Sequence, residues 1–175
     1  MVDESAHNRR TAAEGPGLRA GIVGLEGGGA RPPPWVGVSG YARRVNEARS
    51  AALARRIFEA FERRDAFVLR GLFAEDAVWR VSGRNVLAGT YRGRREIIRF
   101  LGSLPRLTDG TYSSELVDVL ASDERAAVLY RARGLRHGVE LDIDQLLLFT
   151  LRDGRVAAVD AYPSDPVAFD AFWSG

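Results

Sequence analysis

The chain contains no cysteine and no lysine, and only two histidines occur among its 175 residues. Without cysteine, disulfide bonds, thiolate nucleophiles and cysteine-ligated metal sites are excluded. His7 and His137 lie far apart in the sequence, so a histidine-rich metal site is not expected either. We therefore predict a function that needs neither a metal nor an organic cofactor.

All 25 basic residues are arginines, and 23 acidic residues leave a net charge of only +2. The arginines are dispersed among the acids, whereas a nucleic-acid-binding protein presents a clustered basic face. No apolar run is long enough to span a membrane, and the first residues lack the apolar segment of a secretory signal. We expect neither nucleic acid nor a membrane as a partner, and we expect a cytoplasmic location.

Residues 1–45 differ in composition from the rest of the chain. They contain the glycine- and proline-rich runs GPGLRAG, GLEGGGA and RPPPW, which bury too little apolar surface to offset the entropy of ordering. We predict a disordered extension over residues 1–45. Residues 46–175 are predicted to form one domain, of a length usual for a single domain.

Apolar residues recur at helical spacing in the first part of this domain. Asn46 is the predicted N-cap of a first helix, whose apolar stripe is formed by Leu53, Ile57 and Phe61. Asp65 is the predicted N-cap of a second, short helix that reaches Phe73. A third helix is predicted to open at Gly93, with an apolar side formed by Ile97, Ile98, Phe100, Leu101 and Leu104.

The second part of the domain has the pattern of strands. Residues 112–120, 126–135, 139–151 and 155–162 are apolar and β-prone, and short turns separate them. Strands joined by short turns form an antiparallel meander. A further short strand is predicted over residues 77–81, before a glycine-containing loop. Helices followed by a meander predict an α+β domain, with the helices packed on one face of the sheet.

Four motifs carry a resemblance to a known family: LFAEDAVW, LAGTYRGRREII, LRDGRV and AYPSDPVAFDAFW. With this order of helices and strands, the chain resembles the SnoaL-like branch of the nuclear transport factor 2-like superfamily. The resemblance implies a cone-shaped fold, in which three N-terminal helices pack on a curved antiparallel sheet and enclose an apolar pocket. It also implies a homodimer formed through the outer sheet face. The superfamily includes polyketide cyclases, ketosteroid isomerases, limonene epoxide hydrolases and non-catalytic binding modules.

The positions that are catalytic in two of these groups hold other residue types here. The base of the isomerases falls at Val81, and their helical tyrosine falls near Ile57; neither side chain transfers a proton. The late-strand acid of the epoxide hydrolases falls at Ala161, one residue from Asp160, and a shift of one residue in a strand reverses the face. The cyclases need only one acid and a shaped pocket, so their chemistry fits this sequence best.

Three residues are predicted to be catalytic. Asp160 is the preferred general base, Asp144 replaces it if a β-bulge turns that strand, and Tyr91 is a polar contact at the pocket mouth. The alternatives are a salt bridge from Asp160 to an arginine on the dimer face, a solvated Asp144, and a structural hydrogen bond from Tyr91 to its loop.

Six residues are predicted to bind the ligand. Trp79 is either a pocket wall that stacks on a flat molecule or core filler, and Arg80 is either a rim contact or a solvated side chain. Gln145 is a polar residue in an apolar stripe and therefore needs a partner. The remaining predicted ligand-binding residues are Tyr130, Phe149 and Tyr162.

Two functional hypotheses follow. The first is a cofactor-independent bacterial enzyme of secondary metabolism that acts on a small apolar metabolite, as a polyketide cyclase, isomerase or hydrolase. The second is a non-catalytic module of the same fold that binds a small ligand or a second subunit. A carboxyl group that opens into the pocket, within reach of a hydrogen-bond donor, would favour the enzyme.

Overall fold

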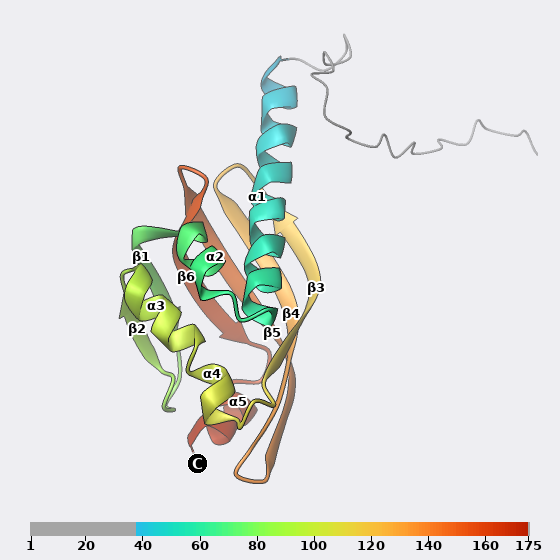
Figure 1. The fold of residues 1–175 in the computed structure, drawn as a ribbon. Helices are drawn as coiled ribbons and strands as arrows, with labels where there is room; N and C mark the ends of the chain where they lie inside the picture. The colour runs from blue at the N-terminus through green and yellow to red at the C-terminus, as the bar shows by residue number, and fades with distance from the viewer. Residues whose placement is uncertain (1–37, 175) are drawn as a thin grey trace, which may run out of the picture. The chain divides into compact units, whose positions relative to one another are not determined.

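The computed structural model describes residues 38–174. Within this range the chain forms five helices and six strands, and the last four strands follow one another without a helix between them (Figure 1). The helices are α1 (Val38–Glu62), α2 (Ala66–Leu72), α3 (Arg94–Leu101), α4 (Leu104–Leu107) and α5 (Pro166–Ser174). The strands are β1 (Phe73–Val81), β2 (Gly89–Arg92), β3 (Ser113–Ala121), β4 (Arg125–Arg136), β5 (Val139–Arg152) and β6 (Arg155–Pro163).

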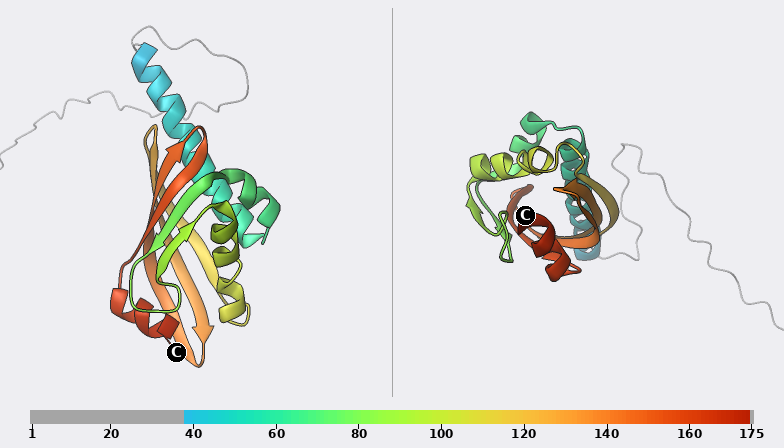
Figure 2. Two further views of the ribbon diagram at one scale, coloured as in Figure 1. Left: turned by 90° about the vertical axis from the view of Figure 1, so that its left-hand side faces the viewer. Right: turned by 90° about the horizontal axis from the view of Figure 1, so that it is seen from below.

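The six strands form one curved sheet in the order β2-β1-β6-β5-β4-β3. The helices α1 to α4 lie against its inner face, and α5 lies across one end (Figure 2). Strands β3 to β6 form the predicted antiparallel meander, and the predicted α+β class is confirmed. Strand β1, however, pairs with β6 in parallel, and β2 forms an antiparallel edge beside β1. Neither pairing was predicted. Residues 89–92 are too short and too polar to show a strand pattern, and no local pattern encodes the distant partner of β1.

Only some of the helices begin where the sequence predicts. Asp65 caps α2 as predicted, since its Oδ1 accepts a hydrogen bond from the Val68 N–H at 2.9 Å. Gly93 is the N-cap of α3. Helix α1 instead begins at Val38, eight residues before the predicted cap Asn46. Residues 38–45 contain no proline and offer no stop signal, so the helix continues through Asn46. The rest of the predicted extension lies outside the described residues.

The core lies between the inner face of the sheet and the helices. Its largest fully buried side chains come from the helices, the strands and the C-terminal helix alike: Phe73, Ile97, Val128, Phe149, Val156, Val159, Phe172 and Trp173. No helix in residues 38–174 is both long and apolar enough to cross a membrane. Across the same residues, no group of three or more acidic or histidine side chains is placed to hold a metal ion.

A β-bulge at Ala157 decides which residues of β6 face the core. Thr150 pairs with Ala158 and Leu151 pairs with Val156, so Ala157 is an extra residue on β6. An extra residue reverses the alternation of faces. Val156 therefore joins the buried inner face, while Asp160 lies on the outer face.

Candidate ligand-binding site

A cavity of about 60 Å³ lies between the inner face of the sheet and the helices. Its wall is mostly aromatic and aliphatic. The lining residues come from α1, from the sheet, from the loops before β2 and β3, and from α3 to α5: Ile57, Phe58, Phe61, Trp79, Val81, Leu87, Phe100, Leu101, Leu104, Tyr112, Ser114, Tyr130, Gln145, Leu147, Ala161, Phe169 and Trp173. No aspartate or glutamate of the described chain is part of this wall.

Helix α5 contributes Phe169 and Trp173 to the wall, and polar contacts fix its position. The Arg136 guanidinium donates from Nη1 to the Phe172 carbonyl at 3.0 Å, near the C-terminal end of the helix. This is the end at which a cation is favoured. The Asp170 carboxylate accepts from the Arg84 N–H at 3.0 and 3.1 Å. These contacts hold the aromatic side chains of α5 against the cavity.

The loop after β1 approaches α5 so closely that glycine is required at its bend. Gly83 has a φ of +126°, and a Cβ there would lie 2.2 Å from Asp170 Oδ1. The neighbouring Asn85 donates from its side-chain Nδ2 to the same oxygen at 2.5 Å. The glycine-containing loop predicted from the sequence thus docks the C-terminal helix.

One side of the cavity is an aromatic wall. The centroid of the Trp79 ring lies 5.6 Å from that of Phe100, and the Tyr91 ring stacks on Phe100 with a centroid distance of 4.2 Å. The Phe58 ring meets Tyr130 edge to face at 5.2 Å. Such contacts fix the rings as well as bury them, so the wall presents a defined surface to a flat molecule.

The hydroxyl groups of Tyr112 and Tyr130 interact inside this apolar environment. Burial raises the pKa of Tyr112 to about 12, although the hydroxyl of Tyr130 acts in the opposite direction. Burial, followed by the proximity of Tyr112, raises the pKa of Tyr130 well above its ordinary value. Both hydroxyls therefore stay protonated at neutral pH and are available as donors.

Three further residues of the wall carry a buried N–H without a hydrogen-bond partner in the described part of the chain. These groups are the indole Nε1 of Trp79, the indole Nε1 of Trp173 and the amide Nε2 of Gln145. Buried donors in proteins almost always have a partner, and leaving one unpaired costs about 1–3 kcal/mol. Unpaired donors around one cavity are typical of a site that is completed by an acceptor from outside the chain.

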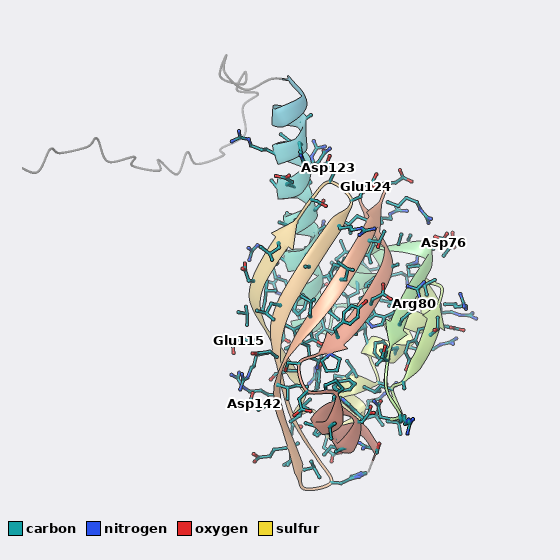
Figure 3. All side chains as sticks on the ribbon, turned by 180° about the vertical axis from the view of Figure 1, so that it is seen from behind. Asp76, Arg80, Glu115, Asp123, Glu124 and Asp142 are labelled. Carbon is teal, nitrogen blue, oxygen red and sulfur yellow. The ribbon has the colours of Figure 1, made fainter. Side chains whose placement is uncertain are left out.

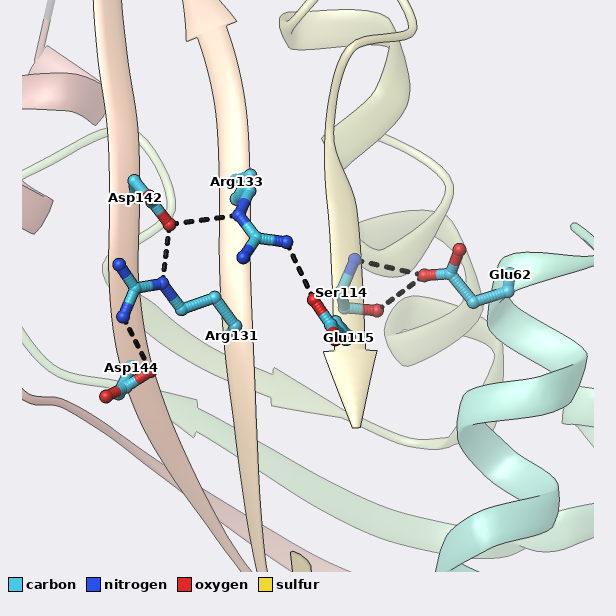
Figure 4. Close-up of polar contacts among 7 residues, drawn as sticks. All are labelled: Glu62, Ser114, Glu115, Arg131, Arg133, Asp142 and Asp144. Carbon is cyan, nitrogen blue, oxygen red and sulfur yellow. Dashed lines mark hydrogen bonds and ion pairs between the residues drawn. The ribbon is translucent and has the colours of Figure 1, made fainter. Parts of the chain in front are cut away.

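Ser114 connects the cavity to a carboxylate. Its side chain is only 6% exposed and forms part of the wall. Both its backbone N–H and its hydroxyl donate to Oε1 of Glu62, at 3.0 and 2.7 Å (Figure 4). Glu62 itself is exposed at the end of α1. The negative charge of Glu62 is also felt by Tyr112, whose pKa it raises further.

The structure brings three of the predicted site residues to the cavity. Trp79, Tyr130 and Gln145 all belong to the wall. Gln145 lies on the inner face with Leu147 and Phe149, as its place in the apolar stripe predicts, and it is 3% exposed. Phe149 is fully buried but is not part of the wall, so it belongs to the core.

Asp160 and Arg80 lie away from the cavity, on the outer face of the sheet. The Arg80 Nη1 donates to Asp160 Oδ1 at 3.0 Å, so the two form a salt bridge between β1 and β6. The predicted general base Asp160 is not part of the cavity wall, because it lies on the outer face of β6. The structure contains the alternative arrangement, in which Asp160 pairs with an arginine.

Asp144 and Tyr162 are also on the outer face. Asp144 Oδ1 accepts from Arg131 Nη1 at 3.3 Å. The pairing of β4 with β5 runs without a shift from end to end, so no bulge turns Asp144 toward the cavity. Tyr162 is 50% exposed. Figure 3 shows the outer face with its charged side chains, among them Arg80 and Asp142.

Tyr91 makes a structural hydrogen bond. Its hydroxyl donates to the Leu87 carbonyl at 2.8 Å, and burial raises its pKa. Tyr91 is not part of the cavity wall. It stabilises the wall indirectly, because its ring stacks on Phe100 and its hydroxyl is hydrogen-bonded to the loop before β2.

Sequence reasoning missed Tyr112, Ser114 and Glu62 as site residues. Alternation along residues 112–116 places Tyr112 and Ser114 on one face, and this signal was available in the sequence. Glu62 lies in a charged helix end, where an acidic residue gives no sign of a buried partner. Its contact with Ser114 joins residues that are 52 positions apart, and no local pattern predicts such a pair.

The model of the SnoaL-like domain family matches residues 54–159, which is more than half of the chain. The chain belongs to the SnoaL-like family. An uncharacterized protein from Mycobacterium tuberculosis is 37% identical over 123 residues, which cover 70% of this chain and 94% of the relative. The predicted resemblance is therefore confirmed.

Solved structures support the same fold for this SnoaL-like domain. Bal32a, from a soil-derived mobile gene cassette, matches with a TM-score of 0.71 and 33% identity, over 73% of this chain and 98% of Bal32a. A protein of unknown function with a cystatin-like fold from Xanthomonas campestris matches with a TM-score of 0.67 and 26% identity. That match covers 72% of this chain and 98% of the Xanthomonas protein.

Proposed function

We propose that this SnoaL-like domain binds a small apolar molecule that carries an acceptor oxygen, such as a carbonyl group. The observation that carries the proposal is the character of the cavity wall. The wall is apolar apart from a few neutral polar groups, and three of its residues hold a buried N–H without a partner among residues 38–174. A ligand oxygen would supply the missing acceptor.

The protonation state of the tyrosines supports the same ligand class. The hydroxyls of Tyr112 and Tyr130 keep their protons at neutral pH, so an acceptor oxygen finds donors there as well. The wall holds no charged side chain of the described residues, and an ionised ligand would lose its hydration without gaining a counter-ion. The expected ligand is therefore neutral.

The size of the cavity favours a small ligand. Pockets for drug-sized ligands typically measure about 300–1,000 Å³, whereas this cavity measures about 60 Å³. A polycyclic molecule would have to displace several closely packed aromatic rings. The SnoaL-like family includes polyketide cyclases and ketosteroid isomerases.

A titration with 1-tetralone, a bicyclic aromatic ketone, tests the proposal. Trp79 and Trp173 belong to the wall, so binding is expected to quench tryptophan fluorescence. Tetralin, the same bicycle without the oxygen, is the comparison ligand. We expect the ketone to bind about tenfold more tightly than tetralin, which is the value of roughly one hydrogen bond.

Two variants of β6 locate the binding. Ala161→Leu fills the cavity, because Ala161 belongs to its wall, and it should weaken the binding of both ligands at least about tenfold. Ala158→Leu adds the same atoms on the outer face of the same strand and should leave binding unchanged. Equal binding by both variants, or no binding by the full chain, would contradict the proposed function.

A further inference from the structure

Ser114 stands between two separate hollows of the molecule. On the inner side it belongs to the apolar cavity. Away from the cavity, Ser114 also lines a groove of about 370 Å³ between α1 and β3. The residues of this groove are Arg55, Phe58, Glu59, Glu62, Arg63, Ser114 and Leu116. Ser114 and Phe58 are the two residues common to both walls. Ser114 therefore lies at a crossing point between the cavity and the groove.

The carboxylate of Glu62 occupies the outer side of this crossing point. Its Oε1 accepts both hydrogen bonds from Ser114, and the second oxygen has no partner in the described chain. Glu62 is exposed, so a proton that reaches it can exchange with water. Figure 4 shows the carboxylate approaching Ser114 from the end of α1, on the side opposite to the charged pairs of β4 and β5.

We propose that Ser114 and Glu62 form a proton relay, which makes the cavity a site of deprotonation next to a carbonyl group. This inference rests on the proposed function, since it requires a ketone in the cavity. Ser114 would contact the ligand. Glu62 would act through Ser114, as the final acceptor of the proton and as the group that orients the hydroxyl.

The step balances without any further reactant. The C–H bond beside the carbonyl breaks, and its proton forms a bond to Ser114 Oγ while the proton of that hydroxyl passes to Glu62 Oε1. The electron pair of the C–H bond moves into a carbon–carbon double bond, and the carbonyl becomes an enolate. In the reverse direction, Glu62 returns a proton through Ser114 to the carbon.

The donors of the cavity stabilise the charge that this step creates. An enolate oxygen develops a negative charge, and preorganised donors in a site with little water stabilise such a charge strongly. Tyr130 and Gln145 lie on adjacent strands and are paired in register. Neither is charged, so the enolate oxygen meets no repulsion in the cavity. The base and the oxyanion donors are thus different residues on different elements.

Hydrogen–deuterium exchange of 1-tetralone tests the relay. The full-length protein is incubated with the ketone in D₂O, and NMR follows the loss of the signal of the hydrogens beside the carbonyl. The dissociation constant is measured on the same sample by tryptophan fluorescence. We expect exchange at saturating ketone to exceed the buffer rate by at least about 100-fold, the usual contribution of a positioned general base.

Glu62→Gln separates proton transfer from structure. Its amide oxygen can still accept from Ser114 but cannot take up the proton, so exchange should fall at least about 100-fold while the dissociation constant stays within twofold. Ser114→Ala should lower exchange at least about tenfold, since it removes the link to Glu62. Glu59→Gln is the matched control, because Glu59 lines the same groove but is not the carboxylate to which Ser114 donates. The ketone should exchange as fast with this variant as with the parent.

The outcomes are distinct. If 1-tetralone binds but exchanges no faster than in buffer, the relay is overturned while the proposed binding function stands. The relay is also overturned if the ketone exchanges as fast with the Glu62→Gln variant as with the parent. If 1-tetralone does not bind, the proposed function itself fails, and the relay fails with it.

Discussion

The polar residues on the two faces of strands β3 to β6 differ in charge and in hydrogen bonding. On the inner face, Gln145 and Tyr130 are buried and neutral, and the Gln145 amide Nε2 has no partner among the described residues. On the outer face, the neighbouring residues Asp144 and Arg131 are charged, half-buried and paired with each other. The same two strands therefore carry an unpaired donor on one face and completed ion pairs on the other.

The outer pairs form a continuous network across three strands. Arg131 donates to Asp142 at 2.6 Å, Arg133 donates to the same oxygen at 3.1 Å, and Arg133 also donates to Glu115 at 2.7 Å (Figure 4). Exposed ion pairs contribute little to stability, because water screens them. The comparison teaches that the ion pairs of these strands lie on the face away from the cavity, whose wall is formed by uncharged residues.

The largest expected effect concerns the inner face. Trp173→Ala removes a fully buried ring and should lower the free energy of unfolding by about 3–5 kcal/mol, a large part of the usual total of about 5–15 kcal/mol. Urea denaturation followed by circular dichroism measures the change. Phe67→Ala is the control, because Phe67 is 87% exposed, and its unfolding midpoint should not move. A Trp173 variant as stable as the parent would show that α5 is not part of the core.

Gln145→Leu should stabilise the protein while weakening its function. The substitution keeps most of the side-chain volume and removes a buried amide whose Nε2 has no partner among the described residues, so the free energy of unfolding should rise by about 1 kcal/mol. The preference for 1-tetralone over tetralin should fall about tenfold. A loss of stability would mean that the amide has a partner in solution, and an unchanged preference would remove Gln145 from the site.

The tyrosines of the inner face should resist ionisation. The pKa of Tyr112 is about 12 and that of Tyr130 is raised well above its ordinary value, whereas both would ionise near about pH 10 in the unfolded chain. Because the folded pKa values are raised, the stability linked to these groups is complete below about pH 10 and is lost as the pH rises further. Absorbance at 295 nm should show fewer ionised tyrosines at about pH 11 in the folded protein than in urea. Equal absorbance would place the hydroxyls in water.

The sequence predicted the meander well, because each strand has a clear apolar pattern and a turn at each end. It could not predict the parallel pairing of β1 with β6, in which Arg80 pairs with Asp160, since no local pattern encodes so distant a partner. The placement of Asp160 depended on a single extra residue, Ala157, within a run of small apolar residues that gives no sign of a bulge. The inward position of Gln145 could be predicted, because its strand alternates regularly and its neighbours on the same face are apolar.

The smallest expected effect concerns the outer network. The hydrogen bond from Arg131, and then the charges of Arg131 and Arg133, lower the pKa of Asp142. A lowered folded pKa contributes stability above the unfolded value of about 3.9, and this contribution is lost as the pH falls through the folded pKa. Asp142→Asn should therefore lower the urea midpoint slightly at about pH 7, and the difference from the parent should shrink at about pH 3. The variant should bind 1-tetralone like the parent, because Asp142 faces away from the cavity. Weaker binding by this variant would show that the two faces are coupled through β5, and the contrast between them would then hold for their structure but not for their function.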